Sequence, residues 1–238
     1  MIEAIRLITE FDRRFDRFAS EYKKNIRLED KISVLNEAHE KIFENRVSIA
    51  EVNSEVRNDL RNFEMKDFSL QKIRASRDYT VFAIPSDYYK MLRIKCVAEK
   101  KDCGTKEIPV TIFQTDDLEQ ALKDDFWTPS YEWETVLGDE GSEGIYLWHK
   151  ETFSTPKCII DYYRKVKDIQ CASLSKTGSY RDFNDNLINY DQGCEMDSTY
   201  LWQSVVDLAV LIARVDIGDD RDAKMQTEKY LLKDKTEK

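Results

Sequence analysis

The sequence lacks the marks of membrane and secreted proteins. Its 238 residues contain no apolar run of about 18, the length that a membrane-spanning helix needs, and the N-terminal MIEAIRLITEFDRRFDRF has no apolar signal-peptide core. The five cysteines are odd in number and nowhere spaced C-x-x-C, which argues against a disulfide framework and a zinc knuckle. We therefore expect a protein without a membrane partner, made in a reducing cytosol, with its cysteines acting as small core residues.

Catalytic motifs are scarce as well. The sequence has no G-x-G-x-x-G, its two histidines, His39 and His149, stand apart from clusters with metal-ligand spacing, and the glycine-rich GDEGSEG lacks the lysine of a phosphate-binding loop. The run from Asp182 to Gly193 alternates like a calcium loop, but Leu187 stands where that loop needs glycine and Gly193 where it needs glutamate. The sequence therefore predicts no metal, no cofactor and no enzymatic activity.

A metal-dependent nuclease is the catalytic alternative. Glu132, Glu134 and Asp161 lie near predicted strands and Lys165 follows, and carboxylates beside a lysine can hold magnesium next to a scissile phosphate. Their spacing differs from the compact Asp, then Glu-x-Lys pattern of such enzymes. Alternating charge on a strand is more typical of a solvated face.

Charge is what the sequence has in abundance. Charged residues make up 35% of the chain, above the usual quarter, which indicates a surface that is solvated or makes polar contacts in an assembly. The 46 acidic residues outnumber the 37 basic ones, and the net charge of -9 argues against a protein that grips nucleic acid through its phosphates. An acidic surface does suit a wall past which DNA slides, because it repels the duplex.

Apolar residues at spacings of three and four predict three helices before a group of strands and one helix after it. The first helix begins near the N-terminus, the second covers Leu28–Asn45, the third Ser48–Asn62 with Ser48 as its N-cap, and the last Ser198–Asp216. The first helix carries an apolar stripe of Met1, Ile5, Ile8, Phe11, Phe15, Phe18 and Tyr22. Either the chain's own helices or a neighbouring subunit must cover this stripe.

The middle of the chain has the period of strands. Strands are predicted at Tyr79–Ile84, Tyr88–Val97, Glu107–Phe113 and Lys157–Lys165. The stretch FWTPSYEWETVLGDEGSEGIYLWHK predicts an ordered aromatic loop and a hairpin, in which Trp133–Leu137 pairs with Ile145–His149. Pro85 interrupts the first ladder and opens a Pro-Ser-Asp corner. The predicted class is α+β, with a helical region 1–65, a β-rich region 66–170, a polar loop or arm 171–197, a helix 198–217 that packs on the core, and a charged tail 218–238.

Five segments carry a resemblance to a known family: VLNEAHEKIFENR (Val34–Arg46), EVRNDLRNF (Glu55–Phe63), TVFAIPSDYYKMLRI, IIDYYRKVKDI and YLWQSVVDLAVLIARV. They resemble the head-to-tail connector and tail-ring proteins of short-tailed phages, crAss-like phages in particular. In many such proteins a Leu-Pro-x-Asp-Tyr corner follows the helical section and a Tyr-Tyr-Arg strand comes later. Here Ile84 replaces the leucine, and Lys165, Val166 and Lys167 follow the strand where a proline is often found.

The resemblance implies a structural virion protein at the head-tail junction or in the tail, present in the host cytoplasm during assembly. It would form a ring, twelvefold to match a portal, with other copies of itself, the portal protein and neighbouring tail-ring proteins as partners. DNA would pass through its channel without specific binding. The alternative is a soluble interaction module outside any virion.

A ring subunit needs two patches that meet at every junction. Three groups of residues are the candidate contacts: the first-helix residues Phe11, Phe15 and Phe18, the polar arm, and the apolar knot of the tail, Tyr230, Leu231 and Leu232. Each group has an alternative within its own chain, and the tail has the further alternative of disorder.

Overall fold

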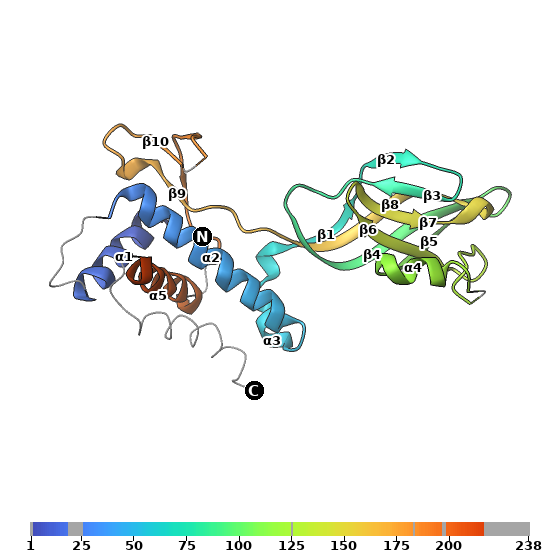
Figure 1. Cartoon of the computed structure of the whole chain (residues 1–238), viewed down its shortest axis with the longest axis horizontal. Helices are drawn as coiled ribbons and strands as arrows, with labels where there is room; N and C mark the ends of the chain where they lie inside the picture. Colours follow the sequence, from blue (N-terminus) through green and yellow to red (C-terminus); the bar gives the residue numbers. More distant parts are fainter. Residues whose placement is uncertain (1, 19–25, 125, 183, 197–198, 217–238) are drawn as a thin grey trace. The chain divides into compact units, whose positions relative to one another are not determined.

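The computed structural model describes residues 2–18, 26–124, 126–182, 184–196 and 199–216 (Figure 1). The chain divides into two compact units, one of Met1–Asn62 with Val166–Lys238 and the other of Phe63–Lys165. Helices dominate the first, called the helical unit below, and one large sheet forms the second, the β unit. The α+β class predicted from the sequence is confirmed.

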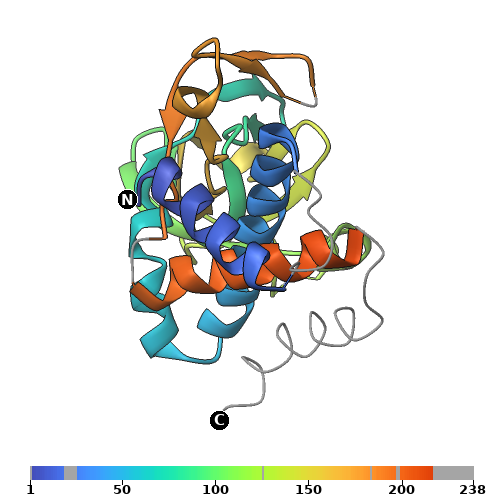
Figure 2. The same ribbon diagram turned by 90° about the vertical axis from the view of Figure 1, so that its left-hand side faces the viewer.

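In the described part of the helical unit, the α-helices are α1 (Ala4–Phe18), α2 (Leu28–Ala50), α3 (Ser54–Asp59) and α5 (Thr199–Asp216). Helix α5, orange-red in Figure 2, packs on α1, in dark blue, and on α2. Its predicted apolar face is buried, because Leu201, Val205, Leu208 and Ile212 are all covered. None of the helices that the structure describes is long and apolar enough to cross a membrane.

The predicted third helix was wrong in its start. Helix α2 continues through Ser48 to Ala50, so Ser48 lies inside a helix and caps nothing. Val47 and Ala50 are buried, and this burial carries α2 past the local capping signal. The real N-cap is Asn53, whose side chain accepts a hydrogen bond from the Glu55 N–H at 2.9 Å, and the short helix α3 follows.

Residues 166–182 and 184–196 return to the helical unit as an ordered segment. Two small two-residue strand pairs, β9 (Gln170–Cys171) with β12 (Asp191–Gln192) and β10 (Tyr180–Arg181) with β11 (Leu187–Ile188), give it shape. The Asn36 side chain of α2 accepts from the Ile169 N–H at 2.6 Å and donates to the Ile169 carbonyl at 3.2 Å. The polar segment is therefore ordered against its own chain, whereas the sequence had left open an arm that orders only against a partner.

The β unit is one sheet of eight strands in the order β1-β8-β4-β5-β6-β7-β3-β2. All neighbours are antiparallel except β5 and β6. The bounds are β1 (Glu64–Ser69), β2 (Lys72–Ala75), β3 (Tyr79–Phe82), β4 (Tyr88–Lys100), β5 (Gly104–Ile112), β6 (Val136–Gly141), β7 (Gly144–Trp148) and β8 (Ser154–Arg164). The short helix α4 (Thr115–Ala121) lies in the connection from β5 to β6.

The sheet closes into a barrel because β1 and β2 are two halves of one bent segment that supplies both ends of the strand order. The first half pairs with β8 and the second with β3. Between the halves, the Leu70 N–H donates to the Cys158 carbonyl and the Ala83 N–H donates to the Gln71 carbonyl, at 2.9 and 2.8 Å. Closure in this way pairs the edges that an open sheet would expose.

Alternate residues of the long strands fill the barrel. Ile94, Cys96 and Ala98 of β4 are buried beside Cys158 and Ile160 of β8. The predicted Pro-Ser-Asp corner carries the chain from β3 to β4, which are not neighbours in the sheet.

The units meet in sequence a few residues away from the predicted region boundaries, at 62/63 and 165/166 instead of 65/66 and 170/171. Glu64 and Met65 already pair with β8, so they belong to the barrel. Lys167 and Ile169 belong to the helical unit, because the Lys167 N–H donates to Glu195 and Ile169 is held by Asn36.

Candidate docking surfaces

The residues considered for catalysis are engaged in structural contacts. Glu134 pairs with Lys106 at 3.1 Å and Glu132 with Lys100, an ion pair that lowers the pKa of Glu132. On another strand, Asp161 accepts from Arg93 Nε at 2.8 Å. Within the described ranges, no group of three or more His, Cys, Asp or Glu side chains is arranged to hold a metal ion.

The two histidines also lie in packed surroundings. His149 Nε2 lies 3.0 Å from the Thr80 hydroxyl, and its Nδ1 lies 2.7 Å from the Lys150 carbonyl oxygen. His39 is buried in α2, and burial lowers its pKa from 6.5 to about 4. The run from Asp182 forms a turn, in which the Asp182 carboxylate accepts the N–H groups of Asn184 and Asn186.

The chain itself covers Ile8, Phe11 and Phe15 of the first-helix stripe, whereas Ile5 is 42% exposed. Phe11 and Phe15 are buried, and their rings stack with centroids 5.7 Å apart. These two rings are therefore not exposed for a neighbouring subunit, which is a correction to their choice as partner contacts. The side chain of Phe18 and the whole of the knot at Tyr230, Leu231 and Leu232 lie outside what the structure describes.

Large aromatic side chains are instead exposed in the connection between α4 and β6. We call residues 124–135 the aromatic loop. Phe126 is 92% exposed, Trp133 85% and Trp127 43%, whereas most aromatic side chains are well covered in folded proteins. The sequence had indicated an ordered aromatic loop here without revealing which rings are exposed.

This loop is held in place by its own hydrogen bonds. The Phe126 N–H donates to Asp124 Oδ1 at 2.9 Å, and the backbones of Ser130 and Thr135 exchange two hydrogen bonds of 2.9 Å. Tyr131 is buried and donates its hydroxyl to the Gly104 carbonyl at 3.0 Å. The exposed rings are thus displayed on an ordered frame, which lowers the entropy that docking would cost.

The aromatic loop and its approach are acidic. Residues 115–135 contain seven acidic side chains and one basic side chain. Some of this charge is balanced by lysines of the barrel, since Lys100 and Lys106 pair with Glu132 and Glu134. The surface around the exposed rings therefore favours a partner of positive charge.

A second exposed surface lies on the segment that closes the barrel. We call residues 66–77, which include β2, the basic ribbon. It contains four basic residues and one acidic residue, and all four residues of β2 are exposed. Ile73 is 53% exposed and Phe68 38%. Sequence reasoning did not find this ribbon, because its residues do not alternate between apolar and polar over a long enough run to predict a strand.

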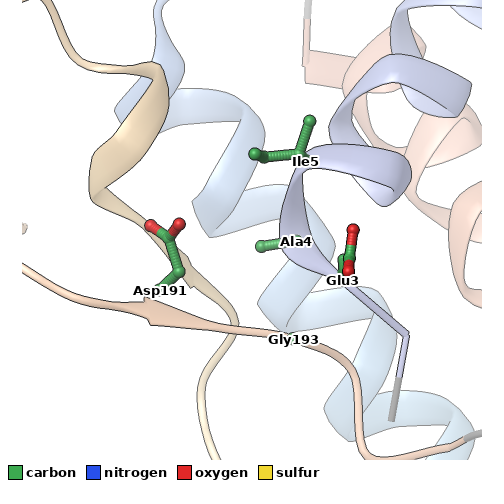
Figure 3. A pocket seen from close by; sticks show the side chains of 5 residues that line it. All are labelled: Glu3, Ala4, Ile5, Asp191 and Gly193. Carbon is green, nitrogen blue, oxygen red and sulfur yellow. The ribbon is translucent and has the colours of Figure 1, made fainter.

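The helical unit has a shallow pocket where the return segment meets the start of α1. Its volume is about 400 Å³, and it is lined by Glu3, Ala4, Ile5, Asp191 and Gly193 (Figure 3). Asp191 is already engaged, because its carboxylate accepts from the Ser173 N–H at 3.0 Å. Acidic groups and a half-exposed isoleucine give this pocket no defined chemistry toward a ligand.

No protein-family model matches the chain, and no curated protein matches it.

Proposed function

We propose that this protein is a structural virion subunit, a ring-forming head-to-tail connector of a short-tailed phage. In this role it extends the DNA channel of the portal and offers a docking platform to other tail proteins. The resemblance of the five segments to connector and tail-ring proteins supports the family, and the surface of the β unit supports the mode of action.

The observation that carries the proposal is the aromatic loop. Phe126 and Trp133 are among the most exposed large side chains of the described chain, and they stand on a loop fixed by Tyr131 and by paired backbone groups. Exposed aromatic side chains of this size are typical centres of protein-protein interfaces. An ordered barrel that displays exposed aromatic side chains is suited to docking with another protein. This arrangement supports a docking component more than an enzyme.

The charge of the chain suits a channel for DNA. At a net charge of -9 per copy, a ring of twelve copies would be strongly acidic, and its surface would repel the phosphates of a passing duplex. DNA passes through such a ring without specific binding. The partners are other copies of the chain, the portal protein and the neighbouring ring, and the protein is found in the virion after assembly in the host cytoplasm.

The burial of Phe11 and Phe15 changes which residues form the junctions. A ring of identical copies needs heterologous interfaces, in which one patch meets a different patch of the next copy. With the first-helix rings covered inside the chain, the junctions have to use other surfaces. The exposed surfaces of the β unit are candidates, and exposed apolar side chains of the helical unit, such as Leu187 and Tyr190, are others.

The test is the composition and structure of purified, DNA-filled phage particles. Mass spectrometry should detect this chain in a fixed ratio to the portal protein. Electron microscopy should show a ring of copies of the chain next to the portal, with a helical unit and a β unit in each copy. A chain that is abundant in infected cells but absent from the particles would contradict the proposal and favour the non-virion interaction module.

A further inference from the structure

We propose that copies of this chain associate head to tail through their β units, with the aromatic loop of one copy docked on the basic ribbon of the next. This inference deepens the proposed function and rests on it for its biological role. Both surfaces belong to the β unit, so the contact between them does not depend on the helical unit.

The two surfaces are complementary in charge. Residues 115–135, the aromatic loop and the segment before it, contain seven acidic residues and one basic residue, and the basic ribbon contains four basic residues and one acidic residue. Three of the four basic residues of the ribbon pair within the chain: Lys66 with Glu64 at 3.2 Å, Arg74 with Glu143 at 3.1 Å, and Arg77 with Glu151. The basic side chain of each pair is half exposed or more, so these ion pairs are weak and open to exchange. Opposite charges of this kind steer two copies together and disfavour loop-on-loop or ribbon-on-ribbon contacts.

The surfaces are also complementary in apolar character. The loop offers Phe126 and Trp133, and the ribbon offers Ile73 and Phe68, each exposed in the single chain. Ile73 stands on β2, where every residue is exposed, so a flat aromatic ring can reach and cover its side chain. Removing these groups from water supplies the gain in free energy, while the surrounding charges select the partner.

The barrel places the two surfaces on opposite sides. Counting from the ribbon, β5 is the third strand in one direction, through β8 and β4, and β6 is the third in the other, through β3 and β7. The aromatic loop joins β5 to β6, and Figure 1 shows β2 and α4 on opposite sides of the β unit. One copy can therefore use its loop on one neighbour and its ribbon on another, as a closed ring requires.

Other partners fit the loop less well. Nucleic acid and anionic lipid surfaces are negatively charged, and the acidic residues of the aromatic loop and of α4 before it would repel them. The chain itself carries a basic surface with exposed apolar groups, so a second copy is the occupant that the described surface favours.

The test uses two full-length variants that each remove one surface. The loop variant carries Phe126→Ser and Trp133→Ser, and the ribbon variant carries Lys72→Glu and Ile73→Ser. All four side chains are exposed, so both variants should keep the thermal unfolding midpoint of the wild type to within a few degrees. Val52→Ser, at a residue of the helical unit that is 77% exposed, is the matched control.

Sedimentation velocity should show that the wild type and the control self-associate with a Kd below about 1 mM, and that raising the salt to about 0.5 M weakens this association. Either variant alone should associate at least about tenfold more weakly. An equal mixture of the two variants should recover dimers but no larger species. In that mixture only the intact loop of the ribbon variant can meet the intact ribbon of the loop variant.

Three results would overturn the inference: a wild type that stays monomeric at about 1 mM, variants that associate like the wild type, or a mixture that recovers no dimers. These results are separate from the test of the proposed function. A ring in the particle built without the loop-ribbon contact would remove this inference and leave the function in place. Recovered dimers from a protein that is absent from particles would remove the function and keep the contact.

Discussion

The burial of His39 predicts how the stability of the helical unit depends on pH. His39 is 1% exposed in α2, and neither of its ring nitrogens has a hydrogen-bond partner among the described residues. Desolvation lowers its pKa from 6.5 to about 4, partly opposed by the charge of the nearby Glu195. The folded protein therefore holds a neutral imidazole at pH values where the unfolded chain binds a proton.

The sign and size of the effect follow from proton linkage. Because the folded pKa is depressed, the stability from this group is fully present above pH 6.5 and is lost as the pH falls towards 4. Two and a half pKa units correspond to about 3 kcal/mol over the whole window, of which about 2 kcal/mol is lost between about pH 7 and about pH 5. The variant His39→Leu removes the titrating group and keeps an apolar side chain in the same place.

The assay is urea unfolding at about pH 7 and at about pH 5, followed by far-ultraviolet circular dichroism. The helical unit contributes most of the circular dichroism signal. The free energy of unfolding of His39→Leu should fall less between the two pH values than that of the wild type, by about 2 kcal/mol. Val52→Ser should keep the wild-type difference. An unchanged difference in His39→Leu, or a His39 resonance that titrates near pH 6.5 in the folded protein, would refute this reasoning.

Three further predictions follow from single contacts. Asn36→Ala removes both hydrogen bonds to the Ile169 backbone and should lower the free energy of unfolding of the helical unit by about 2 kcal/mol in urea titrations; a loss near zero would show that water replaces the amide. Cys103 is the exposed thiol of the five and should alone react quickly with a disulfide reagent in the native protein, with all five reacting after denaturation; fast reaction of a second thiol would contradict the described burial. Gly144 has φ +148° and an added Cβ would lie 2.1 Å from the Phe82 carbonyl oxygen, so Gly144→Ala should lower the thermal unfolding midpoint by several degrees, while Gly178→Ala, with open space around it, should lower it less.

The elements that sequence reasoning found are those with one buried face. Helix α5 repeats apolar residues at the helical period, and β4 buries the alternate residues Ile94, Cys96 and Ala98. The third helix was misplaced because Ser48 and Glu51 form a local capping pattern that tertiary burial overrides. The strands β1 and β2 were missed because their residues are mostly exposed, so hydrogen bonds to β8 and β3 define them and no apolar pattern does.

The candidate surfaces were partly readable from the sequence. An aromatic loop was predicted from FWTPSYEWE, but whether its rings are buried depends on strands far away in the sequence. Tyr131 is covered because Gly104 lies next to its hydroxyl, while Trp133, two residues later, is exposed. The sequence alone could not place the basic ribbon relative to the aromatic loop. Barrel closure places it three strands from both β5 and β6.

Barrel closure also limits how the β unit can assemble. An open sheet can recruit a neighbour by adding a strand to its edge, with main-chain hydrogen bonds that are tolerant of sequence. In the described β unit, β1 pairs with β8 and β2 pairs with β3. Many main-chain N–H and C=O groups of this bent segment are therefore already hydrogen-bonded within the barrel. Association through this unit therefore has to use side chains, and side chains make a contact that depends on sequence and salt. A change of two exposed side chains on either surface should then weaken assembly at least about tenfold without changing the fold, which strand addition would not predict.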